Sequence, residues 1–99
     1  MKKSMNAIKS IRTCLNDYTC GWKNSEALTV IAKASGEIQV EAGSHDYVRE
    51  KLGSLNGWAD KLYSPRKHAL WGTEMVRHFI LCDCDGVEMY LERLRKEAS

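Results

Sequence analysis

The chain has 99 residues, 43% of them hydrophobic and 28% charged, which suits one folded domain and excludes a disordered chain. Its 15 Lys and Arg against 13 Asp and Glu leave a formal net charge of +2. A dedicated nucleic-acid-binding domain of this length usually carries a larger basic excess, so the charge argues against that class. We expect a single domain over residues 1–99.

The N-terminal segment MKKSMNAIKSIRTC begins with two lysines but lacks the apolar run of a signal peptide. No segment approaches the roughly 18 apolar residues that a membrane span needs. These features predict a cytoplasmic protein without membrane contact, whose four cysteines remain reduced.

Residues 3–20 are predicted to form a helix, because apolar side chains recur there at steps of three and four residues. The recurring residues are Met5, Ile8, Ile11, Leu15, Tyr18 and Trp22. Gly21 is a plausible end of this helix.

The segment SEALTVIAKASGEIQVEAG, which begins at Ser25, allows two interpretations. A short helix could begin at Ser25 and end at Gly36. However, apolar residues also alternate on both sides of Ser35-Gly36, and β-branched residues are concentrated in the first half. The alternation favours a β-hairpin.

From Ser44 the helical period returns, with Val48, Leu52, Leu55, Ala59 and Leu62 in one stripe. Gly53 and Gly57 fall on the opposite side and could break this helix. Ser64-Pro65 is typical of a helix start, and a last helix is predicted from there to about Glu97. The predicted fold is therefore α+β and mainly helical: an N-terminal helix, a β-hairpin, and two antiparallel C-terminal helices. An all-α small bundle is the alternative.

The stretch FILCDCDGVE, residues 79–88, resembles the D-x-D-G nucleophile motif of the haloacid-dehalogenase-like phosphatases. That resemblance would imply phosphoryl transfer, with Asp83 as nucleophile and Asp85 as general acid and base. The family's downstream catalytic residues have no place, since residues 84–99 contain no Ser or Thr before Ser99. The helical stripe also runs through the motif in phase, from Val76 to Leu94. We therefore predict a helix here, and no enzyme.

Asp83 lies in the middle of this apolar stripe. A buried carboxylate is costly unless it is paired or hydrogen-bonded. The sequence thus predicts a helix irregularity at CDCDG, a basic or donor partner on a neighbouring helix, or an opening of the stripe toward a binding partner.

Metal binding has weak candidates. His78 and Cys82 are four residues apart on one helical face, and Cys84 is close to them in sequence. No C-x₂-C pair accompanies them, so we predict neither a metal site nor a cofactor.

The segment YSPRKHALWG, residues 63–72, combines basic and aromatic side chains at a predicted helix start. Such residues suit contacts with a protein partner or with nucleic acid. Leu81 and Met89 add apolar groups on the outer side of the last helix. The predicted partner-binding residues are Tyr63, Arg66, Lys67, His68, Trp71, Leu81, Asp83 and Met89.

These observations predict a small non-enzymatic protein that acts by binding a larger protein, as an inhibitor, adaptor or regulator. Phage and mobile-element accessory proteins are often of this kind. The alternative is a nucleic-acid-binding module that uses residues 63–72, whose affinity would fall steeply with salt. Self-association through exposed apolar groups is a third form of contact that this composition allows.

Overall fold

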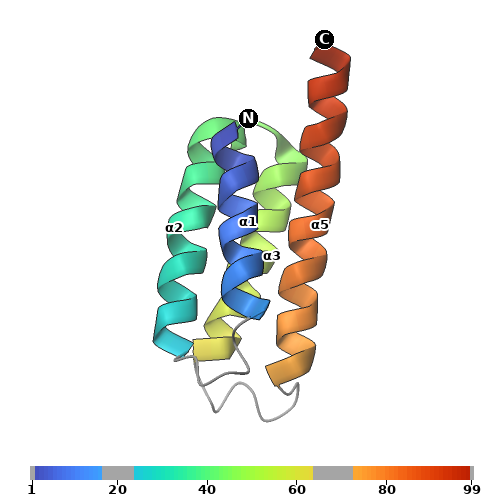
Figure 1. Cartoon of the computed structure of the whole chain (residues 1–99). Helices are drawn as coiled ribbons and strands as arrows, with labels where there is room; N and C mark the ends of the chain where they lie inside the picture. The colour runs from blue at the N-terminus through green and yellow to red at the C-terminus, as the bar shows by residue number, and fades with distance from the viewer. Residues whose placement is uncertain (1, 17–23, 64–72, 99) are drawn as a thin grey trace.

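A computed structural model describes residues 2–16, 24–63 and 73–98 of the chain. Those residues form four helices, α1 (Lys2–Asn16), α2 (Asn24–Ala42), α3 (Asp46–Tyr63) and α5 (Thr73–Ala98). The helices run alternately up and down, and each lies beside its neighbours in the order α1, α2, α3, α5 and back to α1 (Figure 1). The fold is an antiparallel four-helix bundle.

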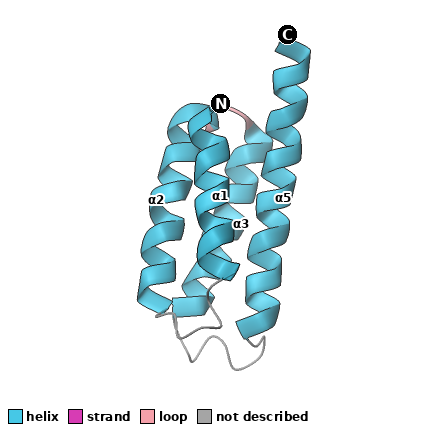
Figure 2. Ribbon diagram, in the orientation of Figure 1, coloured by secondary structure: helices cyan, strands magenta, loops and turns pink. Residues whose placement is uncertain are grey.

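The predicted α+β class with a β-hairpin is wrong, and the all-α alternative is correct. The described residues contain no strand, and the predicted hairpin segment is the single helix α2 (Figure 2). Its buried residues are spaced by three or four positions: Ala27, Ile31, Ala34, Ile38 and Ala42. A stripe of this period faces one side of a helix only.

Two residues of α2 explain why the prediction of a hairpin was wrong. Val40, which fits the alternating pattern, is 89% exposed. Gly36 does not end the helix, because it lies on the exposed side, where a Cβ would meet nothing within 4 Å. β-Branched residues have a weak local preference for strands, and burial against two neighbouring helices outweighs it.

The predictions for the other helices are largely confirmed. The last helix runs through CDCDG without a break, and α3 runs through both of its glycines. A Cβ at Gly53 or at Gly57 would also meet nothing within 4 Å, so both lie on the outer side as predicted. The predicted end of the first helix at Gly21 and the start at Ser64-Pro65 lie outside the described residues.

One core fills the bundle, and all four helices contribute to it. Its largest fully buried side chains are Ile8, Ile11, Leu15, Ile31, Ile38, Val48, Leu55, Val76, Ile80, Val87 and Leu91. Small residues such as Ala7, Ala34 and Ala59 are buried beside them, which allows neighbouring helix axes to approach closely.

Side chains of neighbouring helices bond to both ends of α1. It has no acidic residue in its first turn and no basic residue in its last. The backbone N–H of Ser4 donates to Glu41 Oε1 on α2 at 3.0 Å, and Arg77 Nε on α5 donates to the Leu15 carbonyl at 2.7 Å. A carboxylate at the N-terminus and a guanidinium at the C-terminus both complement the helix dipole.

Candidate interaction face

Two aromatic stacks lie along the seam between α3 and α5. The rings of Tyr47 and Tyr90 stack with centroids 4.9 Å apart, and those of Trp58 and Phe79 with centroids 4.6 Å apart. Lys61 Nζ lies 4.5 Å from the centre of the Trp58 ring, a cation–π distance. Each stack joins one ring from each helix, so the seam is closed by aromatic side chains along its outer edge.

Helix α5 carries a second stripe of apolar or small side chains outside its core-facing stripe. The members follow each other at steps of four, three, four and three residues: Met75, Phe79, Cys82, Gly86 and Met89. This spacing places them along one side of a helix. Met75 is 47% exposed and Met89 is 67% exposed, so the stripe is directed to solvent rather than to the core.

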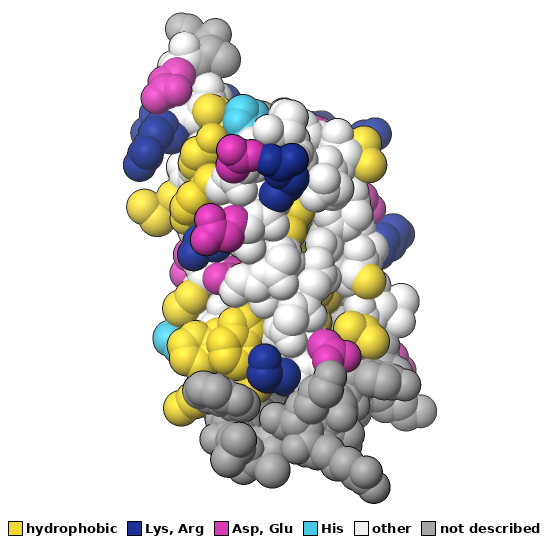
Figure 3. All heavy atoms as spheres, turned by 180° about the vertical axis from the view of Figure 1, so that it is seen from behind, with side chains coloured by type: hydrophobic (Ala, Val, Ile, Leu, Met, Phe, Trp, Pro, Cys, Tyr) yellow, Lys and Arg dark blue, Asp and Glu magenta, His cyan; other side chains and the backbone are white. Residues whose placement is uncertain are grey.

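We call the surface formed by these two features the Met-aromatic face. It consists of Tyr47 and Trp58 on α3 and of Met75, Phe79, Met89 and Tyr90 on α5. It holds three of the four exposed large apolar side chains found among the described residues, Tyr47, Met75 and Met89. On the side of the molecule seen in Figure 3, hydrophobic side chains gather in an upper and a lower group along α5.

The upper part of the face is hollowed into a shallow groove of about 240 Å³, lined by Tyr47, Gly86, Met89, Tyr90 and Arg93. Gly86 allows α3 to approach, because a Cβ there would lie 2.9 Å from the Tyr47 hydroxyl oxygen. The Tyr90 hydroxyl lies 3.3 Å from His45 Nδ1, and this contact holds the ring in place. An aromatic, a methionine and an arginine side chain thus meet at one concave surface.

Asp83 lies about one helical turn before Gly86 on α5. It is only 7% exposed, and its Oδ1 lies 4.0 Å from Lys51 Nζ on α3. The predicted basic partner on a neighbouring helix is therefore Lys51, and the helix does not break at CDCDG. Because Asp83 is buried in the seam, a partner would not contact its carboxylate directly in this conformation.

The other predicted binding residues differ in how exposed they are and in whether the structure describes them. Leu81 is half-buried and packs against the core, whereas Met89 is exposed. Tyr63 is the last residue of α3. Arg66, Lys67, His68 and Trp71 lie outside the described residues, so the surface predicted at residues 63–72 stays a prediction.

Two of the three weak metal candidates come together, and the third does not join them. His78 Nε2 and Cys82 Sγ are 3.5 Å apart on the exposed side of α5. Cys84 is fully buried, and burial raises the pKa of its thiol to about 12. Across the described ranges, no three His, Cys, Asp or Glu side chains are grouped so that they could hold a metal ion.

Comparison with protein-family models, with curated proteins and with solved structures finds no match to this chain. Within residues 2–16, 24–63 and 73–98, none of the helices combines the length and the apolar character needed to cross a lipid bilayer.

Sequence reasoning missed most of the Met-aromatic face, since only Met89 was among the predicted binding residues. The signal was present on α5, where the second stripe repeats at helical spacing beside the core stripe. Tyr47 and Trp58 could not be assigned in this way. Their place depends on how α3 and α5 align, which the sequence of either helix alone does not specify.

Proposed function

We propose that this chain is a non-enzymatic protein-binding protein that acts through the Met-aromatic face, as an inhibitor, adaptor or regulator of a larger protein. The observation that carries the proposal is that Met89 and Tyr47 are both exposed on this face, where the Tyr47 ring is stacked on that of Tyr90. Exposed apolar groups gathered on one surface favour association, and aromatic, methionine and arginine side chains are enriched in protein interfaces.

The character of the face supports a protein partner rather than a small substrate. Its polar groups are few and its groove is shallow, whereas a catalytic pocket needs several convergent polar groups. The aromatic rings are held by stacking, so little side-chain entropy would be lost on binding. Methionine side chains adapt to irregular apolar surfaces. These properties fit contact with a larger protein or with a second copy of this chain.

The test compares the wild-type chain with Met89→Glu and Tyr47→Ala as baits in pull-downs from the native host, read by quantitative mass spectrometry. Val40→Glu is the matched control, because Val40 is an equally apolar and highly exposed residue on α2. Recovery of a specific partner should fall about tenfold or more with Met89→Glu, since buried interface anchors contribute about 2 kcal/mol or more each.

The same variants are examined by sedimentation velocity for self-association. A wild-type dimer that is lost in Met89→Glu but retained in the control Val40→Glu would identify the partner as a second copy of this chain. Equal recovery of the same partners by wild type, Met89→Glu and Tyr47→Ala would exclude this face. A partner recovered only by chains with intact residues 63–72 would instead favour the surface predicted there.

A further inference from the structure

A second groove lies between the first turn of α1 and the last turns of α5. It measures about 380 Å³ and is lined by Lys2, Met5, Asn6, Leu91, Glu92 and Arg95. Helix α5 is the longest helix, with 26 residues, and it continues past the end of the other three (Figure 1). The groove forms where this projecting end passes α1.

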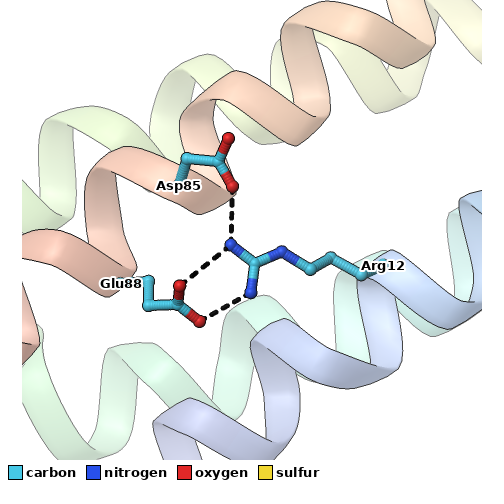
Figure 4. Close-up of polar contacts among 3 residues, drawn as sticks. All are labelled: Arg12, Asp85 and Glu88. Carbon is cyan, nitrogen blue, oxygen red and sulfur yellow. Dashed lines mark hydrogen bonds and ion pairs between the residues drawn. The ribbon is translucent and has the colours of Figure 1, made fainter.

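The seam between α1 and α5 is looser than the other three seams of the bundle, and contact between these two helices is the least extensive. One ion-pair cluster holds the middle of this seam (Figure 4). Arg12 donates to both carboxylate oxygens of Glu88, at 2.6 and 3.2 Å, and to Asp85 Oδ1 at 2.6 Å. Toward the projecting end of α5 the charges give way to an apolar floor, which is formed by the half-buried Met5 over the core residue Leu91.

The rim of the groove is mainly basic. Lys2 and Arg95 stand on its two sides, and Glu92 is the one acid that lines it. Lys3 is exposed next to Lys2 in the first turn of α1. The antiparallel arrangement brings these bases together, because the start of α1 and the end of α5 lie at the same end of the bundle (Figure 1).

The lysines are not explained by the stability of α1. Basic residues in the first turn of a helix oppose the helix dipole, and α1 has no acid there to offset them. Glu41 from α2 accepts a hydrogen bond from the Ser4 N–H, and it is not among the residues that line the groove. Arg95 by contrast suits the dipole at the C-terminus of α5. The position of Lys2 at the rim therefore points to a negatively charged partner.

We propose that this groove binds an acidic amphipathic helix of a partner protein. An apolar side chain of that helix lies on Met5, and its carboxylates pair with Lys2 and Arg95. Helix-in-groove binding combines an apolar anchor with charged edges in this way. The apolar floor favours a peptide over a nucleic acid, whose phosphates would use the rim alone. This surface is separate from the Met-aromatic face, and neither proposal depends on the other.

Methionine methyl NMR tests the proposal, because Met5 lines this groove while Met75 and Met89 belong to the Met-aromatic face. The probes are two synthetic helical peptides of about 16 residues with identical leucines at i, i+3 and i+4 spacing. One has glutamate and the other lysine at its polar positions. A single-stranded oligonucleotide of about 20 nucleotides is the third probe.

The acidic peptide should shift the Met5 methyl signal saturably and leave those of Met75 and Met89 in place. Its Kd should rise about tenfold in the double variant Lys2→Glu/Arg95→Glu. The control Lys9→Glu/Lys33→Glu makes the same charge change at exposed residues that line neither groove, and it should bind as wild type. Lys2→Glu suits the dipole at the start of α1, whereas Arg95→Glu opposes the dipole at the end of α5. Met75 and Met89 methyl signals that match those of wild type would show that the double variant is folded, so that loss of binding does not reflect unfolding.

Four results would overturn the proposal. These are no shift at Met5 with the acidic peptide, an equal shift with the lysine peptide, shifts confined to Met75 and Met89, and unchanged affinity in Lys2→Glu/Arg95→Glu. An oligonucleotide that shifts Met5 as strongly as the acidic peptide would assign the groove to nucleic acid instead. Shifts at Met5 alone leave the Met-aromatic face to be judged by its own variants.

Discussion

Lys51 and Asp83 face each other across the seam between α3 and α5, with Nζ 4.0 Å from Oδ1. The lysine side chain is 35% exposed, whereas the aspartate side chain is 10% exposed. Oδ2 of Asp83 is buried and has no hydrogen-bond partner within the described part of the chain. The carboxylate thus carries most of the cost of this pair, because Lys51 can still reach water.

Asp83→Leu should therefore leave the free energy of unfolding unchanged or raise it by about 1–3 kcal/mol, since an apolar side chain removes a poorly satisfied charge. Lys51→Ala should lower it by about 1–2 kcal/mol, because the buried carboxylate then loses its partner. Urea unfolding of both variants measures the two effects. A larger loss in Asp83→Leu than in Lys51→Ala would show that the carboxylate stabilises the fold in a way that this geometry does not reveal.

Glycines on the outer sides of the helices should be replaceable with a gain in stability. Gly36→Ala, Gly53→Ala and Gly57→Ala should each raise the free energy of unfolding by about 0.5–1 kcal/mol, because alanine favours the helix and a Cβ meets nothing within 4 Å. Gly86→Ala is the contrasting variant, since its Cβ would meet the Tyr47 hydroxyl oxygen at 2.9 Å. The melting temperature of Gly86→Ala should be lower than those of the other three variants. An equal gain in stability would mean that Tyr47 moves away from the new Cβ without cost.

The Arg12 cluster should couple α1 to α5. Glu88 and Asp85 raise the pKa of Arg12, first through the hydrogen bonds from its guanidinium to Glu88. A double-mutant cycle of Arg12→Ala and Glu88→Ala should give a coupling energy of about 0.5–1 kcal/mol, because both side chains are partly solvated. High salt should reduce this value. A coupling near zero at low salt would mean that the pair contributes nothing to the seam.

Glu41 should make the stability of α1 depend on pH. The Ser4 side chain and the Ser4 backbone N–H lie against its carboxylate and hold the pKa of Glu41 below its usual range. A depressed carboxyl pKa stabilises the folded state above the unfolded value of about 4.3, and the effect is lost as the pH falls through the folded value. Glu41→Ala should cost about 0.5 kcal/mol at pH near 7, and the difference from wild type should shrink below about pH 4. Urea unfolding across this pH range measures it, and a difference that does not change with pH would exclude the charged cap.

Cys82 should be the first of the three described thiols to react with an alkylating reagent. It is exposed, whereas Cys14 and Cys84 are buried and the pKa of Cys84 is raised to about 12 by burial. The thiolate is the reacting form, so a buried thiol of high pKa stays inert. Brief iodoacetamide treatment of a Cys20→Ser variant, followed by peptide mass spectrometry, should label Cys82 alone. Labelling of Cys84 at a similar rate would show that the core around α5 opens under native conditions.

The sequence by itself determined the parts of this protein whose apolar period is long and unbroken. The stripe of α5 runs through FILCDCDGVE, and that period correctly predicted a helix in place of a phosphatase motif. The stripe of α3 likewise predicted a helix with Gly53 and Gly57 on its outer side, and the break that these glycines could have caused is absent from α3. In both helices the pattern repeats over several turns, so one interpretation explains many residues at once.

Only the tertiary structure decided the remainder. Residues 25–42 satisfy a helical and an alternating pattern over short distances, and packing between α1 and α3 selects the helix. The partner of Asp83 and the pairing of Tyr47 with Tyr90 depend on the alignment of two helices. The groove at Lys2 and Arg95 forms only because α1 and α5 lie side by side in the bundle. Periodicity specifies which side of a helix is buried, but contacts with its neighbours decide which residues of different helices meet.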